Sequence, residues 1–305
     1  MTARFPQVLL LGNGLNRAFD SHDWNALIKK LWSSEAAFSM ENEVLDSVPF
    51  PLKIVLATND RVDEALGGCG NLLCNKRELG DLRDPLRQLL KMPFDHILTT
   101  NYSYELEMAT KDIKCSSCGK CALKRSTGHT DAVKCLEAKY MLHSYNCVNV
   151  DGHERKVWHI HGEARKPNSV IIGHYYYGNL LARIQNELNK RGNKQYERQK
   201  SGESALIESW VDAFIMGDVY ILGFGYDLSE MDLWWLLNRK KREKAQHGRT
   251  MFYEPETEET IAKHALLKTY GVDVRTLGVR GKPDDFKSFY RAAIEDIRKD
   301  IGDTI

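Results

Sequence analysis

The stretch VLLLGNGLN, from Val8 to Asn16, decides the fold. Its four leading apolar residues predict a short buried strand of a parallel sheet, and two glycines follow at once. Gly12 and Gly14 let the backbone turn tightly and approach a phosphate before the next helix. A third glycine at the dinucleotide-binding spacing is absent, because position 17 is Arg17. The stretch therefore indicates either a nucleotide site or an ordinary strand-to-helix turn.

Length and composition describe a globular chain with no charge bias. The 305 residues are 42% hydrophobic, enough for a large core, and we expect one domain over residues 1–305. The 43 Lys and Arg residues balance 42 Asp and Glu residues, so the net charge of +1 favours neither nucleic acid nor a membrane surface. Apolar runs are far shorter than the roughly 20 residues of a membrane span, and no signal-peptide pattern is present. We expect a soluble, cytoplasmic protein.

Strand and helix patterns alternate along most of the chain. Further apolar strands are predicted at residues 97–99, 157–161, 219–222, 250–254 and 272–279, with helical patterns between them. This alternation predicts an α/β fold with a Rossmann-like, doubly wound parallel sheet. Residues 33–92 show short helical segments, which indicate a helical insertion or lid.

Polar residues and glycines follow four of these strands. Thr100 and Asn101 end the second strand, where open α/β sheets place ligands, although either could simply cap a helix. Alternation in KVWHIHG directs His159 and His161 to one face, but no acidic partner lies at a metalloenzyme spacing, so a single functional His161 is preferred. The segment GFGYD supplies a second glycine turn, and Ser229 with Asp232 resembles a capping box for the helix behind it.

Residues 111–151 differ from the rest of the chain in being cysteine-rich. A Cys-x-x-Cys-Gly turn favours a zinc site, but a structural site usually needs a second close cysteine pair, and none is present. A bound zinc ion and surface or redox-active thiols both stay open for this cysteine-rich insertion. The cysteines concerned are Cys115, Cys118, Cys121, Cys135 and Cys147.

Taken in order, GNGLN, TTNY, HIHG and GFGYD resemble the motifs of the sirtuin-like fold, especially the divergent prokaryotic domains of antiphage defence systems. The resemblance spans residues 8–279, with residues 111–151 as an unmatched insertion. In sirtuins the first glycine motif holds the NAD pyrophosphate. Its places are taken here by Gly12, Asn13, Gly14 and Asn16, and Asn16 replaces the family's serine.

The same resemblance assigns roles to residues at the other strand ends. Asn101 matches the asparagine that orients the nicotinamide ribose and the attacking water, and Thr100 beside it is carried over as a binding residue. His161 matches the histidine that contacts the ribose hydroxyls and acts as general base. The adenosine half is expected at Gly223, Gly225 and Tyr226, and Asp23 falls near the loop that covers nicotinamide.

The resemblance implies hydrolysis of NAD+ to nicotinamide and ADP-ribose, as an effector of abortive infection. Deacylating sirtuins carry two Cys-x-x-Cys pairs after the His-Gly motif, whereas every cysteine of this chain precedes His161. An NAD-dependent protein deacylase and a non-catalytic NAD or ADP-ribose sensor stay open as alternatives. An enzyme that depletes NAD+ needs restraint, so we expect a regulatory protein from the same operon, a homo-oligomer, or both.

Overall fold

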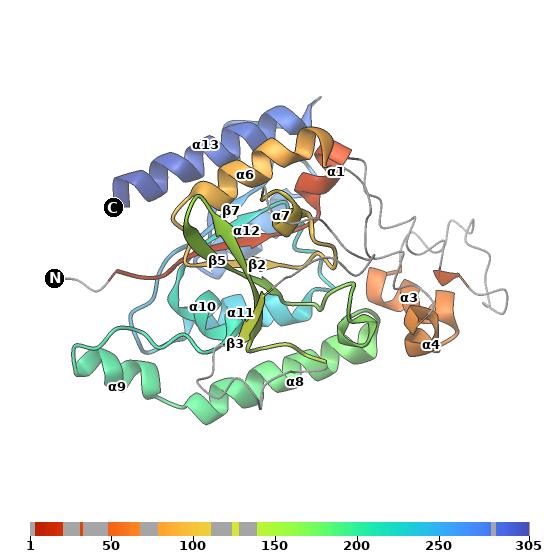
Figure 1. Ribbon diagram of the computed structural model, residues 1–305, viewed down its shortest axis with the longest axis horizontal. Helices are drawn as coiled ribbons and strands as arrows, with labels where there is room; N and C mark the ends of the chain where they lie inside the picture. The colour runs from red at the N-terminus through yellow and green to blue at the C-terminus, as the bar shows by residue number, and fades with distance from the viewer. Residues whose placement is uncertain are drawn as a thin grey trace.

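The computed structural model describes residues 4–20, 31–32, 48–67, 79–110, 124–127, 139–281 and 285–304. Within these residues, eight strands form one sheet in the order β3-β4-β5-β2-β1-β6-β7-β8 (Figure 1). The strands are β1 (Gln7–Leu11), β2 (His96–Thr99), β3 (Lys124–Thr127), β4 (Ser144–Val150), β5 (His153–His159), β6 (Asp218–Leu222), β7 (Thr250–Tyr253) and β8 (Asp273–Arg275).

The run of strands from β5 to β8 is parallel throughout, which confirms the predicted α/β fold. The antiparallel edge formed by β3 and β4 was not predicted. One signal for it was in the sequence, because Asp151 and Gly152 join β4 to β5. Both residues have positive φ, as a two-residue hairpin turn requires, and Asp-Gly is a strong hairpin signal.

Helices cover both faces of the sheet (Figure 1). One face packs on α1 (Gly14–Asp20), α6 (Arg83–Lys91), α7 (Glu105–Met108) and α13 (Phe286–Thr304). The other packs on α8 (His174–Arg191), α10 (Trp210–Met216), α11 (Met231–Lys241) and α12 (Ile261–Thr269). Strand β1 shows why, since Val8 and Leu10 point into one core and Leu9 and Leu11 into the other.

A third, smaller core lies beside the sheet. It joins α3 (Phe50–Thr58) and α4 (Val62–Gly67) to residues such as Tyr102 and Val170. Within the expected helical insertion, α3 and α4 thus pack together, whereas α6 packs directly on the sheet. The remaining elements are the 3-10 turns η2 (Gly80–Leu82) and η3 (Pro167–Ser169) and helix α9 (Lys194–Lys200).

Strand order fixes where a ligand can enter. The chain runs from β1 to β2 on one side and later adds β6 on the other side of β1, so the order reverses at β1 and β6. In open α/β sheets, ligands bind beyond the carboxyl ends of the strands at this reversal. The register places Thr99, Leu11, Leu222 and Tyr253 in one row, so the loops that follow them start at one edge.

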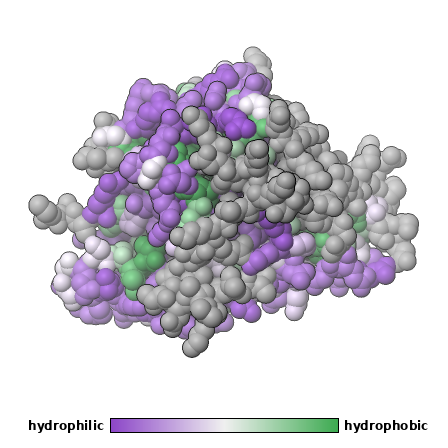
Figure 2. All heavy atoms as spheres, viewed as in Figure 1, coloured by the Kyte–Doolittle hydropathy of each residue, from purple (hydrophilic) through white to green (hydrophobic). Residues whose placement is uncertain are grey.

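Among the described residues, none of the helices is long and apolar enough to cross a bilayer. On the face shown in Figure 2, the coloured surface is mostly hydrophilic, with small separate apolar areas.

Candidate functional site

A cavity of about 440 Å³ lies at the carboxyl edge of the sheet. Asn13 and Gly14 line it from the turn after β1, and Thr100 lines it from the end of β2. The turn after β6 contributes Gly223, Gly225 and Tyr226. His161 lines the same cavity, so one hollow collects residues from all four predicted strand ends. It lies where the strand order reverses, as the topology requires.

The two glycine turns are locked to each other. The amide of Gly12 donates to Leu222 O at 2.9 Å, and the amide of Gly14 donates to Gly223 O at 2.7 Å. A Cβ on Gly14 would lie 2.8 Å from Gly223 O, so a side chain there would separate the turns. Gly225 differs, because its two chain neighbours aside, no atom of the described residues lies within 4 Å of its added Cβ. The fold thus requires glycine at Gly12 and Gly14 but not at Gly225, which faces the cavity.

Arg17 supplies a positive charge to this end of the cavity. Its side chain is exposed and lines the cavity, and its guanidinium has no ion-pair partner among the described residues. Because the amides of Gly12 and Gly14 already have acceptors, an anionic ligand needs other donors, and Arg17 is available. Sequence reasoning treated position 17 only as a missing glycine. Asn16 is fully buried, and neither amide atom of its side chain has a hydrogen-bond partner among the described residues.

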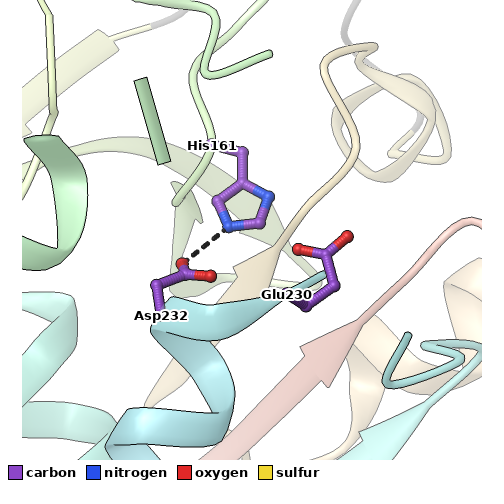
Figure 3. Close-up of side chains that lie close together, drawn as sticks. All are labelled: His161, Glu230 and Asp232. Atoms are coloured by element: carbon purple, nitrogen blue, oxygen red, sulfur yellow. Dashed lines mark hydrogen bonds and ion pairs between the residues drawn. The ribbon is translucent and has the colours of Figure 1, made fainter. Parts of the chain in front are cut away.

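His161 is held by a carboxylate on α11. Its Nε2 lies 2.9 Å from Asp232 Oδ2, and both side chains are essentially buried. Asp232 and Glu230, at the start of α11, flank the imidazole (Figure 3), and the donor atoms of the three lie within 4.8 Å of one another. Such donors suit a divalent cation, but Nε2 of His161 is already committed to Asp232.

Burial and charge alter the proton affinity of this trio. Burial alone would lower the pKa of His161, but the charge and hydrogen bond of Asp232 outweigh it and raise that pKa above its usual value. Burial also raises the pKa of Glu230 to about 7, opposed by the His161 charge and reinforced by that of Asp232. The site therefore holds an ion pair beside a carboxyl group that ionises near neutral pH.

Asn101 lies behind the cavity wall rather than on it. Its Oδ1 is buried and has no hydrogen-bond partner in the part of the chain that the structure describes, and Thr100 next to it lines the cavity. Thr99 Oγ1 accepts from the Asn101 amide at 3.1 Å, and His159 Nδ1 donates to the Asn101 carbonyl at 2.8 Å. The backbone of Asn101 is thus fixed from two sides while its side-chain oxygen stays unsatisfied.

The prediction that His159 and His161 share a face is wrong. His159 Nε2 pairs with Glu107 on α7 at 2.9 Å, whereas His161 pairs with Asp232 on α11. The strand ends at His159, so alternation does not extend to His161, and Gly162 with a φ of 93° continues the turn. Burial opposes but does not prevent a raised pKa at His159, because the Glu107 carboxylate is adjacent.

The capping box predicted at Ser229 and Asp232 is also wrong. Ser229 donates to Asp227 through its hydroxyl, and Asp232 bonds His161 instead. The residue before α11 is Glu230, and its side chain makes no capping bond. Sequence reasoning therefore missed both acidic partners of His161. The available signal was two carboxylates within three residues of each other, directly after a cavity-lining glycine turn.

Other wall residues were also missed, namely Glu254 after β7 and Tyr290 on α13. Glu254 is held by Lys263 at 2.7 Å and by His264 at 2.9 Å.

Asp23 lies outside the described residues, as do Cys115, Cys118, Cys121 and Cys135. Cys147 lies on β4 and is half-buried. The zinc hypothesis therefore stays a prediction.

A sequence profile of the SIR2-like domain matches residues 95–275, more than half of the chain. The chain belongs to the SIR2-like domain family. The match to this SIR2-like domain runs from just before β2 to the end of β8, so it includes Asn101, His161 and the second glycine turn. SIR2-like domains are in general NAD-dependent enzymes, so membership is compatible with an NAD-related activity. No curated protein matches the chain.

Proposed function

We propose that this SIR2-like domain hydrolyses NAD+ to nicotinamide and ADP-ribose. The observation that carries the proposal is the single cavity lined by both glycine turns, Thr100 and His161. A dinucleotide is long and needs binding groups at several strand ends at once. The reversal of strand order at β1 and β6 supplies such a place.

In this proposal, the pyrophosphate lies against Asn13 and Gly14, with Arg17 balancing its charge. The adenosine half lies along Gly223, Gly225 and Tyr226, where the open space beside Gly225 admits a ligand. The nicotinamide ribose lies at His161. Asn16 and Asp23 keep the binding roles that the sirtuin resemblance implies.

The chemistry matches these residue types. Nicotinamide leaves as a neutral molecule from a cationic precursor, so bond breaking needs little acid catalysis. It needs stabilisation of an oxocarbenium-like ribose and a positioned water. The unsatisfied Oδ1 of Asn101 is suited to accept a hydrogen bond from that water, once a small shift opens it to the cavity. His161 contacts the ribose hydroxyls.

The biological role that we propose is antiviral defence by abortive infection in the cytoplasm. Loss of NAD+ would stop an infected cell, so the activity needs control by a protein from the same operon or by homo-oligomerisation. Neither a zinc ion nor a nucleic acid has a part in the proposed reaction.

The test is nicotinamide release from NAD+ by the purified chain, alone and with the products of neighbouring genes. We expect Asn101→Ala and His161→Ala to abolish release without loss of fold. His153→Ala is the matched control, because His153 lies exposed at the start of β5, the strand that precedes His161. Undiminished turnover in both site variants would refute the assignment.

The alternatives give different results in the same assay. A deacylase would form O-acyl-ADP-ribose only when an acyl-lysine peptide is added. A sensor would bind NAD+ or ADP-ribose tightly in calorimetry, with no turnover in any combination.

A further inference from the structure

Breaking the nicotinamide bond creates positive charge on the ribose and, after water attack, a proton to remove. In glycoside hydrolysis a carboxylate next to the sugar serves both needs. Among the residues that the sirtuin resemblance assigns to this site, the one carboxylate is Asp23, which lies outside the described residues.

Three carboxylates among the described residues line the cavity, and two of them are already engaged or exposed. Asp227 is exposed, and its Oδ1 accepts from both the amide and the hydroxyl of Ser229. Glu254 is clamped between Lys263 and His264. Glu230 is the remaining one.

Glu230 is placed for a reaction at the ribose. Its Oε2 is buried with no hydrogen-bond partner in the described part of the chain, and the neighbouring Tyr177 hydroxyl favours the charged form of the carboxylate. Figure 3 shows its carboxylate on the opposite side of the His161 imidazole from Asp232. Glu230 thus lies on the cavity wall, beside the residue that contacts the ribose, and its carboxylate keeps acceptor capacity that no described group uses.

The Asp232 bond changes what His161 can do. With Nε2 donating to a buried carboxylate, His161 retains its proton and is a poor acceptor for another. An ion pair of this kind orients the imidazole toward the ribose hydroxyls. The acceptor for the water proton must then be another group.

We propose that Glu230 is the catalytic carboxylate, which stabilises the ribosyl cation and accepts the proton of the attacking water. This rests on the NAD-cleaving function proposed above. The bond from C1′ to the nicotinamide nitrogen breaks, and its electron pair neutralises the pyridinium. Water oxygen bonds to C1′, one water proton passes to the Glu230 carboxylate, and solvent later removes it. Asp232 is a positioning residue that acts through His161.

Glu230→Gln tests the proposal, because it preserves the size of the side chain and removes its charge and its ability to take up the water proton. We expect kcat for nicotinamide release to fall roughly 100-fold or more, with KM changed less than about threefold. Glu258→Gln, at an exposed position outside the cavity, is the control and should match wild type. Glu230→Gln turnover within threefold of wild type would overturn the role of Glu230 alone. Absence of release from wild type would overturn the proposed function itself.

If Glu230→Gln does not fold, the pH dependence of the wild-type rate tests the role of Glu230 instead. The kcat of wild type should rise with pH through an ionisation near the Glu230 pKa of about 7. A rate that is constant from pH 5.5 to 8 would contradict the proposal. Six titratable groups act on the Glu230 charge: Tyr102, His161, Tyr177, Tyr226, Asp227 and Asp232.

Discussion

At the scale of single residues, the site depends on how Asp232 and Glu230 divide their roles around His161. Asp232 is fully buried and holds Nε2 of His161, whereas Glu230 lines the cavity. Two carboxylates in such different surroundings are suited to different tasks, one structural and one chemical.

Asp232→Asn should separate the two roles. The amide keeps the shape but removes the charge that stabilises protonated His161, so the pKa of His161 should fall. We expect kcat to fall roughly 100-fold, with a smaller loss in Asp232→Glu, which restores the charge. The histidine titration, followed by NMR, should move to lower pH in Asp232→Asn. An unmoved titration would contradict the positioning role.

The raised pKa of Glu230 should also change how the stability of the protein depends on pH, which can be measured without an assay of activity. Its pKa is raised on folding, so the folded state binds its proton more tightly, and this contribution to stability is lost as pH rises toward about 7. Glu230→Gln removes the cost of ionising the buried group. We therefore expect the difference in Tm between Glu230→Gln and wild type to shift in favour of the variant as the pH rises from 5 to 8. A constant difference in Tm would contradict the raised pKa.

At the scale of elements, the turns after β1 and β6 behave as one unit, because two hydrogen bonds between them, from the Gly12 and Gly14 amides, close the carboxyl edge of the sheet. Gly225 belongs to the same turn as Gly223, but a Cβ added to it would meet none of the described residues outside its chain neighbours within 4 Å. The glycines therefore divide into those needed for folding and one available for binding.

Gly12→Ala and Gly225→Ala should fail in different ways. A methyl on Gly12 meets the backbone of Gly223 and Phe224, so we expect a loss of about 1 to 3 kcal/mol in the free energy of unfolding. Gly225→Ala should unfold like wild type but bind NAD+ several-fold more weakly. Denaturant titration and calorimetry measure the two effects. Equal NAD+ affinity in Gly225→Ala and wild type would remove Gly225 from the binding site.

At the scale of the whole molecule, the reversal of strand order at β1 and β6 places the site. Binding of a dinucleotide there should stabilise the entire fold, because it joins loops from several strands. With ligand at 100 times its Kd, the expected gain is about 2.7 kcal/mol. We expect NAD+ and ADP-ribose to raise Tm and nicotinamide alone to have little effect. A shift with nicotinamide alone would contradict the proposed placement of the pyrophosphate.

Much of the fold could be predicted from the sequence, because each parallel strand is a short apolar run such as Val8–Leu11, followed by a turn signal. Strand β4 was missed because only one face of it is consistently buried and it lies next to the cysteine-rich residues. Its Asp151-Gly152 turn was the signal that local reasoning overlooked.

The sequence predicted that these strand ends meet, but it did not predict the charged partners of His161. The turns containing Gly14, Thr100, His161 and Gly223 do meet in one cavity. The partners of His161 could not be derived, because Asp232 is 71 residues away and meets it only through the packing of α11. In the sequence, the spacing of Asp232 from Ser229 is that of a helix cap. Its contact with the His161 imidazole produces no pattern in the neighbouring residues.

The most direct test of the central claim is mass spectrometry of the products formed from NAD+ by the purified chain with the products of its neighbouring genes. The account predicts equal amounts of nicotinamide and ADP-ribose without any acyl-lysine peptide, and their loss in Glu230→Gln and His161→Ala. NAD+ that binds but stays intact in every combination, or O-acyl-ADP-ribose formed only with the peptide, would contradict it.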